Sequence, residues 1–402
     1  MKISYLLKFI LLLPKYMVYV LSFTFHRNKK IWIFGSASGA FQDNAKYLYL
    51  AMIEEFTDNK CIWIANSDAD ITAVAKYGGL AYKRWSLYGL YYSLTGKYWF
   101  VNAYSNDINY YASGGAVIIN LWHGIPYKKI EKDIDGGVLM NRYSSPSITD
   151  YLRYPWIYKK PDWMISPSDF VTEYAFTSAF SIEADRCLSF GNPRLALFDK
   201  PHDYICNFLV NKNCDDQIRI IDFAQSYEKT FIFMPTWRDA NANFMSSMTN
   251  DLFKLNDVLK NNNFLLLLKC HPNTPNDALS LYESLSNVLI IDNKSDVYPL
   301  LPFTDGLITD YSSIMFDYVI LDKPIYLYLF DYDEYVSGSR TSYFDLKEYA
   351  PGEVSLNVDE LIKNLLSADN KSEIRSIIKN TFWKGNDSLD SSKLIFEFFK
   401  GL

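Results

Sequence analysis

Two of the four histidines in this chain follow apolar runs and stand beside lysine and proline. His123 lies in the segment 121–129, which reads Leu-Trp-His-Gly-Ile-Pro-Tyr-Lys-Lys and follows the apolar run that begins at residue 116. His271 lies in the segment 264–272, which reads Phe-Leu-Leu-Leu-Leu-Lys-Cys-His-Pro. An imidazole exchanges a proton near neutral pH, and lysines attract phosphate. If the two rings face one another across a cleft, they would form a proton-transfer site for a phosphate-bearing substrate.

The loop after His123 supplies further candidates for ligand contact. Gly124 has no side chain, so the backbone there can approach a ligand closely. Pro126 follows, and Lys128 adds positive charge at the same place. We expect Gly124, Pro126 and Lys128 to lie on the acceptor side or in the cleft.

The second half of the chain carries groups suited to phosphate. Thr236 offers a hydroxyl and Arg238 a planar fork, directly after an apolar run, and the alternative is that the two residues only form a turn. Lys269 follows five apolar residues, so its amine is expected to be partly buried. Burying a charged amine is costly unless an anion such as phosphate lies beside it. The alternative for Lys269 is a side chain that reaches the surface.

Residues 307–317 read Leu-Ile-Thr-Asp-Tyr-Ser-Ser-Ile-Met-Phe-Asp. A strand that ends at Asp310 is followed by Ser312 and Ser313, which would open a helix whose first N–H groups bind anions. The alternative, compatible with the first, is that Asp310 or Ser312 only caps that helix. Asp331 and Asp333 could hold a divalent metal on a nucleotide phosphate.

Strand and helix signals alternate along the chain, which favours parallel sheets with helices on both faces. The expected strands are 31–35, 61–65, 98–101, 116–121, 162–165 and 186–191, then 230–234, 264–269, 288–291, 306–309 and 324–329. We expect an α/β fold of two doubly wound Rossmann-like domains, residues 29–200 and 215–400, that face a cleft. Ligands of such sheets bind outside the carboxyl ends of the strands, where every motif above falls.

Composition narrows the class of protein. A length of 402 residues fits two domains, and 49% hydrophobic residues suffice for real cores. The net charge of −6 and pI of about 5.4 argue against a nucleic-acid partner. The five cysteines are scattered without a Cys-x-x-Cys pair, which indicates reduced thiols and no zinc site.

The amino-terminal residues 1–28 are apolar but broken by lysines and Pro14, so they lack the run of about 20 apolar residues that a spanning helix needs. They also lack a signal-peptide cleavage site. We interpret them as an amphipathic segment on the cytoplasmic face of the membrane, with Arg27, Lys29 and Lys30 against anionic headgroups. The alternatives are a helix packed on the body of the protein and a single-pass anchor. The apolar positions of residues 84–94 roughly follow a helical period, which predicts either a second interfacial helix or a crossover helix packed on a sheet.

The motifs together resemble the CDP-glycerol glycerophosphotransferase family, which makes teichoic-acid-type poly(polyol phosphate) chains. The resemblance rests on the ordered set Trp122-His123-Gly124-Ile125-Pro126, Lys128, Gly191-Asn192-Pro193-Arg194, Pro235-Thr236, Arg238, Lys269, His271-Pro272, Thr309-Asp310-Tyr311-Ser312-Ser313, Phe316-Asp317 and Lys323-Pro324. It implies a two-domain GT-B transferase bound peripherally to the inner membrane surface. Arg194 is then expected on the acceptor side.

The resemblance also implies a reaction: transfer of glycerol phosphate or ribitol phosphate from a CDP-polyol to a hydroxyl of a lipid-linked or glycan acceptor, with release of CMP. His123 would be the general base, and His271 would stabilise or protonate the leaving phosphate. The implied donor-phosphate residues are Thr236, Arg238, Lys269, Asp310, Ser312, Ser313 and Arg340. In this chain Thr341 follows Arg340 where the family usually has glycine, which suggests a different donor polyol.

Two other functions stay open. One is a GT-B glycosyltransferase that uses a nucleotide sugar, and the other is a non-catalytic, membrane-bound glycan-binding protein. For the polyol-phosphate transferase and for the glycosyltransferase alike, we expect no cofactor apart from an optional divalent metal.

Overall fold

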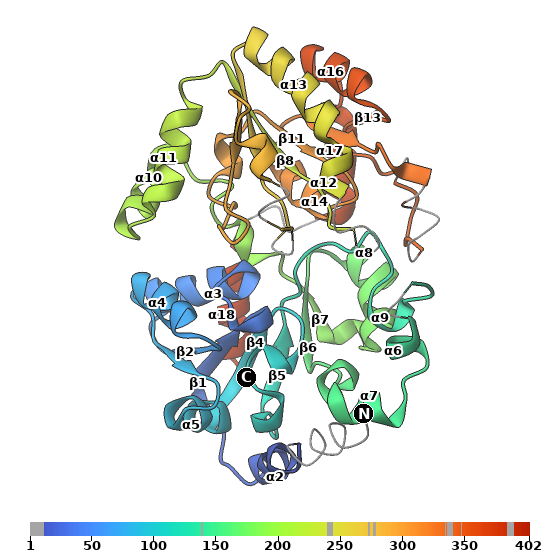
Figure 1. The fold of residues 1–402 in the computed structure, drawn as a ribbon. Coiled ribbons are helices and arrows are strands. Elements are labelled where there is room, and N and C mark those ends of the chain that lie inside the picture. The colour runs from blue at the N-terminus through green and yellow to red at the C-terminus, as the bar shows by residue number, and fades with distance from the viewer. Residues whose placement is uncertain are drawn as a thin grey trace. The chain divides into compact units, whose positions relative to one another are not determined.

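The computed structural model describes residues 12–137, 140–238, 244–271, 274–275, 279–333, 335, 341–346, 348–383 and 390–402. The chain divides into two compact units (Figure 1). The first comprises Met1–His123, Asn141–Ala196 and Ser388–Leu402, and the second comprises Gly124–Met140 and Leu197–Asp387. The continuous ranges expected from the sequence differ from these units at two places. Residues 124–140 group with the second unit, and the carboxy-terminal residues group with the first.

The first unit contains a parallel sheet of seven strands in the order β3-β2-β1-β4-β5-β6-β7. The strands are β1 (Asn28–Gly35), β2 (Lys60–Ala65), β3 (Ala81–Lys83), β4 (Gly96–Val101), β5 (Val117–Asn120), β6 (Trp163–Ser166) and β7 (Cys187–Ser189). The order reverses between β1 and β4, which makes this the topological switch point of a doubly wound sheet. The carboxyl ends of β4 and β5 therefore lie at the edge where ligands bind in such folds.

Helices cover both faces of this sheet. They are α2 (Leu13–Ser22), α3 (Asp43–Glu54), α4 (Asp68–Lys76), α5 (Leu87–Thr95), α6 (Met140–Ser144), α7 (Ile148–Arg153), α8 (Asp169–Val171), α9 (Thr177–Phe180) and α18 (Ser391–Lys400). On one face, α3 and α18 bury Met52, Ile395 and Phe399 against the strand residues Trp32 and Phe100. The other face packs on α5, so the strands read as continuous apolar runs.

The second unit contains a parallel sheet of six strands in the order β10-β9-β8-β11-β12-β13. The strands are β8 (Lys229–Met234), β9 (Phe264–Leu268), β10 (Val288–Ile290), β11 (Gly306–Thr309), β12 (Ile325–Tyr328) and β13 (Glu353–Ser355). The helices are α10 (His202–Asn211), α11 (Asp215–Ala224), α12 (Phe244–Ser247), α13 (Thr249–Asn261), α14 (Ile314–Tyr318), α16 (Val358–Leu366) and α17 (Ser372–Phe382). Here the strand order reverses between β8 and β11, so their carboxyl ends form the switch point.

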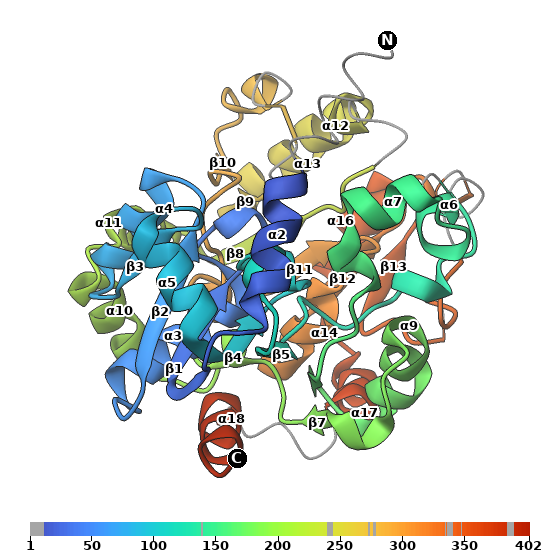
Figure 2. The same ribbon diagram turned by 90° about the horizontal axis from the view of Figure 1, so that it is seen from below.

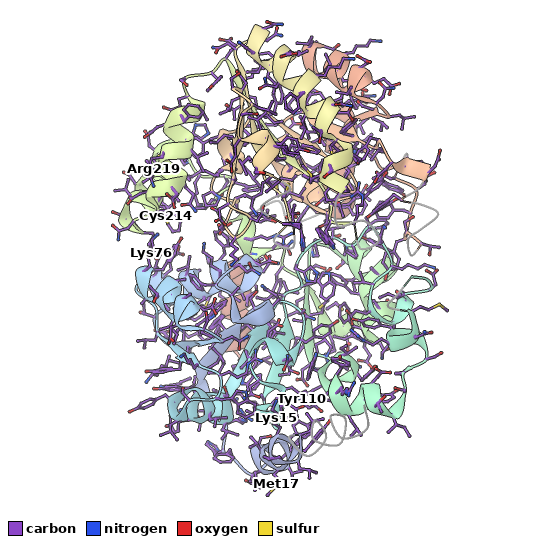
Figure 3. The ribbon with its side chains drawn as sticks, viewed as in Figure 1. Lys15, Met17, Lys76, Tyr110, Cys214 and Arg219 are labelled. Carbon is purple, nitrogen blue, oxygen red and sulfur yellow. The ribbon has the colours of Figure 1, made fainter. Side chains whose placement is uncertain are left out.

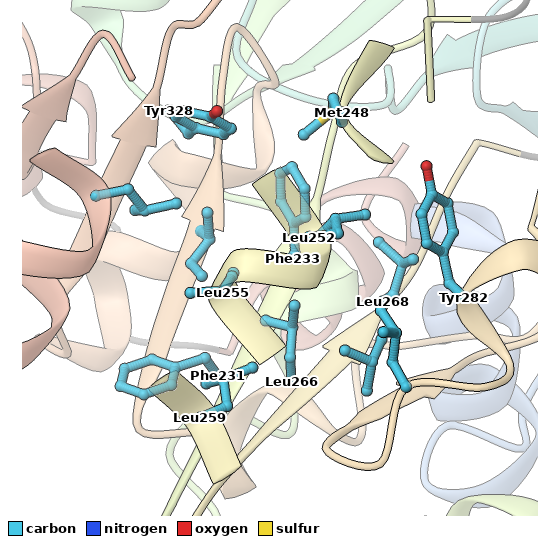
Figure 4. Close-up of a cluster of buried hydrophobic side chains, with 14 of the residues drawn as sticks. Phe231, Phe233, Met248, Leu252, Leu255, Leu259, Leu266, Leu268, Tyr282 and Tyr328 are labelled. Atoms are coloured by element: carbon cyan, nitrogen blue, oxygen red, sulfur yellow. The ribbon is translucent and has the colours of Figure 1, made fainter. Parts of the chain in front are cut away.

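The core of the second unit lies between its sheet and the helix α13 (Figure 4). Leu252, Leu255 and Leu259 recur at helical spacing and form the buried stripe of that helix. They pack on side chains of alternate strand positions, including Phe231 and Leu266. This packing fixes β8 and β9, whose carboxyl ends carry the motifs.

The expected α/β class with parallel sheets is confirmed. Every strand expected from the sequence is present, but the prediction missed β3 and β13. Each of these two has three residues and lies at an edge of its sheet, so it gives almost no periodic signal.

In the amino-terminal segment, α2 covers residues 13–22, while residues 1–11 lie outside the described part. None of the helices in the described part of the chain is both long and apolar enough to cross a bilayer. The expectation that Arg27 contacts headgroups is wrong. Its guanidinium donates to the carbonyl oxygens of Ala112 (2.7 Å) and Gly96 (3.1 Å), and burial lowers the pKa of Arg27 to about 10.

Candidate active site

His123 is presented by a sharp turn at the end of β5. The amide of Asn120 holds this turn: its Oδ1 accepts the Trp122 N–H (2.9 Å), and its Nδ2 donates to the carbonyl of Ala103 (2.8 Å). Trp122 has a φ of +50°, a left-handed conformation that is rare for a bulky residue. Such strain costs on the order of 1–3 kcal/mol and persists only where neighbours enforce it. The turn leaves the side chain of His123 exposed.

The ring of His123 is oriented by the loop that follows β4. Its Nδ1 lies 3.4 Å from the carbonyl oxygen of Asn102. A carbonyl only accepts, so this contact selects the tautomer with a proton on Nδ1 and makes Nε2 the basic nitrogen. Asn102 is itself fixed, because its N–H donates to the buried Asp107 carboxylate (3.0 Å) and its Oδ1 accepts from the Ala45 N–H (2.9 Å). Burial raises the pKa of Asp107 to about 7, although backbone N–H groups oppose this shift.

Arg194 supports the backbone of His123. Arg194 is only 3% exposed, and its guanidinium donates to the His123 carbonyl (2.8 Å) and to Asp43 (2.7 Å). Arg194, which the family resemblance implies on the acceptor side, is held within the first unit by these contacts and supports the backbone at the histidine.

The three candidate residues of the loop after His123, which are Gly124, Pro126 and Lys128, group with the second unit. Gly124 has a φ of +144°, which L side chains rarely adopt, so glycine is favoured there. Pro126 is buried. Lys128 forms an antiparallel bridge with Ser342, and its Nζ lies 3.4 Å from the centre of the Tyr335 ring. The loop is therefore held by Tyr335 and Ser342, which belong to the same unit.

The switch point of the second unit brings together two of the predicted motifs. The Thr236 N–H and hydroxyl both donate to the Asp310 carboxylate, at 2.9 and 2.6 Å. These residues follow β8 and β11, which are neighbours in the sheet. Asp310 is fully buried and also accepts the Tyr311 N–H (2.6 Å).

Arg238 donates to carboxylates of its own unit. Its Nε and Nη2 donate to the two oxygens of Asp331 (2.7 and 3.0 Å), and Nη2 also lies 2.8 Å from Asp310. Its Nη1 donates to the carbonyl of Thr236 (2.6 Å). Burial would lower the pKa of Arg238, but the two carboxylates outweigh it and raise that pKa, so the guanidinium stays charged. The guanidinium of Arg238, predicted from the sequence to bind phosphate, thus links its own loop after β8 to the loops that carry Asp310 and Asp331.

Aromatic rings line the same place. The rings of Tyr311 and Tyr335 stack with centroids 3.6 Å apart, and the Tyr311 hydroxyl lies 3.3 Å from Asp331. Burial, followed by the nearby carboxylates, raises the pKa of Tyr311, so the phenol stays protonated. The cation of Lys128 lies on the Tyr335 ring, so the stack is covered by positive charge.

Lys269 and His271 follow β9. Lys269 is 8% exposed, so it does not reach the surface, and its Nζ donates to the carbonyl of Asn293 (2.6 Å). Burial lowers its pKa. His271 is exposed, and its ring centre lies 6.0 Å from that of Trp237.

The helix α14 after Ser312 and Ser313 has only five residues. Its N-cap is Ser313, whose own side chain makes no capping hydrogen bond, while the Ser312 hydroxyl accepts the Ile314 N–H at 3.5 Å. Ser312 and Ser313 are half-buried. A helix this short gives little dipole support for an anion, so any phosphate contact here depends on N–H groups and hydroxyls.

Sequence reasoning missed Asn44, Asn102 and Tyr335, because single amides and tyrosines outside a motif carry no signal. Arg340, predicted on the donor phosphate, lies outside the described residues. Asp331, a candidate metal ligand with Asp333, is bound by Arg238. Among the described residues, no cluster of three or more His, Cys, Asp or Glu side chains is arranged to hold a metal ion.

Comparison with known proteins gives a consistent picture. The family model described as CDP-Glycerol:Poly(glycerophosphate) glycerophosphotransferase matches residues 16–399. A teichoic acid poly(glycerol phosphate) polymerase of Staphylococcus epidermidis is 28% identical over 377 residues, and the match spans 90% of this chain but 49% of that protein. The chain therefore spans about half the length of this relative.

Two other similar proteins are matched over nearly their whole length. A teichoic acid glycerol-phosphate transferase of Staphylococcus aureus is 27% identical, over 93% of this chain and 94% of that protein. The solved structure of the wall teichoic acid polymerase TagF has a TM-score of 0.76 and 26% identity, over 98% of this chain and 95% of that chain. The α/β fold is thus shared with a wall teichoic acid polymerase.

Proposed function

The chain belongs to the CDP-glycerol:poly(glycerophosphate) glycerophosphotransferase family, and we propose that it transfers a polyol phosphate from a CDP-polyol to a hydroxyl of a lipid-linked or glycan acceptor. It is a transferase of teichoic-acid-like polymer synthesis. The donor would be CDP-glycerol or CDP-ribitol, and the product besides the extended acceptor is CMP.

The observation that carries the catalytic part of this proposal is the fixed presentation of His123. Nε2 of His123 takes the proton of the acceptor hydroxyl while the hydroxyl oxygen attacks the phosphorus that bears the polyol. The bond between this phosphorus and the bridging oxygen breaks, and CMP leaves with the electron pair. The attacked phosphorus keeps its polyol, so a phosphodiester forms.

We further propose that His271 and Lys269 act on the pyrophosphate. Lys269 supplies a buried cation close to the end of β9, where positioning and charge neutralisation dominate phosphoryl-type catalysis. His271, exposed two residues on, donates a hydrogen bond or a proton to the departing phosphate. The contacts of Thr236, Arg238 and Asp310 support a different role for these three residues, which is to hold the donor loops in place.

A donor screen tests the proposed function. The purified chain is incubated with a hydroxyl-bearing acceptor and CDP-glycerol, CDP-ribitol or a panel of nucleotide sugars, and products are identified by mass. We expect release of CMP and an acceptor enlarged by one or more polyol phosphates. Turnover of a nucleotide sugar alone would favour the glycosyltransferase. Binding of glycan without any turnover would favour the non-catalytic protein.

We also propose that the first unit lies on the cytoplasmic membrane surface through α2. This helix is tied to the unit by its inner side: the Tyr16 hydroxyl donates to the Leu152 carbonyl (2.9 Å), and Tyr19 stacks on Tyr110 with centroids 4.8 Å apart. Its outer side carries Met17, which is labelled in Figure 3, and Val20, and these two residues are 65% and 68% exposed. An amphipathic helix that turns its apolar side to solvent needs an apolar partner.

Two neighbouring helices extend this apolar surface. α5 and α7 lie on either side of α2 (Figures 1 and 2), and Leu87 of α5 and Ile148 of α7 are 88% and 80% exposed. Lys15 lies beside Trp85, with its Nζ 5.9 Å from the ring centre, and adds the positive charge that favours anionic lipid. The stretch 84–94 therefore serves both as a crossover helix, through buried Tyr92, and as part of this surface.

Vesicle binding tests the membrane proposal. We expect the double substitution Met17→Glu and Val20→Glu to lower the fraction bound to anionic vesicles by tenfold or more, since each buried apolar side chain contributes roughly 1.5–3 kcal/mol. The matched control is Ile377→Glu, which changes an apolar residue of the second unit that is 59% exposed. Equal binding of the double variant and the control, with unchanged thermal stability, would contradict the proposal.

A further inference from the structure

The backbone around His123 is held by one buried side chain outside all the motifs. Asn44 stands near the start of α3 and is fully buried. Its Nδ2 donates to the carbonyl oxygens of Trp122 (2.9 Å) and Leu121 (3.3 Å). Its Oδ1 accepts the N–H of Arg194 (3.2 Å). One amide thus joins α3, the turn after β5 and the segment that supplies Arg194.

These bonds bear directly on the strained residue. The two carbonyls that Asn44 binds flank the left-handed backbone of Trp122, and the next residue is His123. Arg194, positioned by Asn44, binds the carbonyl of His123 itself. Without these donors, the turn can relax toward an ordinary conformation of Trp122. Because His123 follows it directly, such a relaxation would shift the imidazole.

We propose that Asn44 is a positioning residue for His123: it holds the left-handed turn that aims the imidazole at the acceptor hydroxyl. The inference rests on the proposed role of His123 as the base. Only an amide of this length can donate twice and accept once here, since aspartate has no donor and alanine has neither function. A displacement of about 1 Å at a reacting group can cost on the order of 10²-fold in rate.

The primary test is the kinetics of Asn44→Asp. We expect kcat to fall roughly 10–100-fold, while KM for the CDP-polyol changes less than about threefold, because the donor-phosphate residues belong to the second unit. The matched control is Asn287→Asp, a buried amide whose Nδ2 donates to the carbonyl of Phe264 (2.8 Å) at the amino end of β9. We expect this control to lose stability but keep kcat. If Asn44→Asp does not fold, Asn44→Ser introduces no charge and replaces it.

A double-mutant cycle separates positioning from a general loss of structure. The same Asn44 substitution is measured in the His123→Ala background, where no base is left to aim, and we expect it to change the residual rate less than threefold. Equal losses in both backgrounds would overturn the positioning role, as would normal kcat in Asn44→Asp when His123→Ala is inactive. Normal turnover in His123→Ala would instead overturn the base assignment, and the positioning role with it.

Discussion

Replacing His123 by alanine is expected to lower kcat by about 10²–10⁴-fold, the usual contribution of a general base. The expectation follows from the described geometry of the first unit. The contact between Nδ1 and the Asn102 carbonyl leaves Nε2 as the nitrogen that can accept a proton. An alanine keeps the backbone turn but removes this acceptor, so the acceptor hydroxyl must attack without losing its proton to the protein.

The measurement is steady-state turnover with CDP-glycerol and CDP-ribitol, together with donor binding by calorimetry. Donor affinity should stay within a few-fold of the original, because the role proposed for His123 concerns the acceptor hydroxyl. The matched control is His202→Ala, which removes an imidazole that binds the carbonyl of Pro302 (3.1 Å) in the second unit. We expect that variant to keep normal turnover.

Near-normal kcat in His123→Ala would rule out the base assignment. Lost turnover together with lost donor binding would instead indicate that His123 contacts the donor. The donor-binding measurement distinguishes this second outcome from loss of the base, and it needs no acceptor.

The sequence predicted the strands that carry the motifs because their apolar runs end abruptly at polar residues. It could not predict which charges meet. Arg238 is recognisable as a cation after a strand, but its partners Asp310 and Asp331 lie 72 and 93 positions further on, and only the order of the strands brings them together. The sequence therefore indicates that Arg238 pairs with an anion, but it leaves open whether that anion is a ligand phosphate or a carboxylate of the protein.

The limits of the two units could not be predicted for the same reason. The last helix, α18, has an apolar stripe that includes Ile395 and Phe399, and any apolar face could accept it. It packs on the sheet of the first unit, where Phe399 meets Phe100. Likewise, residues 124–140 join the second unit partly through backbone hydrogen bonds, such as that from Tyr343 N–H to Tyr127 O (2.9 Å). Such backbone hydrogen bonds do not depend on the identity of the side chains, so the sequence does not predict them.

The second large effect is expected for Arg238→Met, which should destabilise the second unit by about 3–5 kcal/mol, the usual cost of leaving buried charges uncompensated. Arg238 is 5% exposed, and it neutralises Asp310, which is fully buried, and Asp331. Methionine keeps much of the side-chain volume, so the loss reports the missing charge and hydrogen bonds rather than a cavity. A unit of this size should lose roughly 2–4 °C in Tm per kcal/mol.

Two further variants test whether this loss of stability comes from the two carboxylates that Arg238 no longer neutralises. The control is Arg219→Met, which breaks an ion pair with Asp216 on α11 whose side chains are 75% and 82% exposed (Figure 3). Exposed pairs contribute little, so its Tm should change by only a degree or two. Adding Asp310→Asn and Asp331→Asn to Arg238→Met should recover part of the lost stability, because the amides can be buried without a counter-charge.

The same variant decides between two roles of Arg238 in the donor site. If its guanidinium bound the pyrophosphate, Arg238→Met would raise KM for the CDP-polyol while Tm stayed close to that of the original protein. If it holds the switch-point loops, Tm falls first, and the partial recovery by Asp310→Asn and Asp331→Asn appears in Tm and in KM together. The fork is already bound by Asp331, Asp310 and the Thr236 carbonyl, so we expect the second pattern. Donor phosphate would then be neutralised mainly by groups such as Lys269, which gives Lys269→Met the opposite signature: a raised KM with a smaller change in Tm.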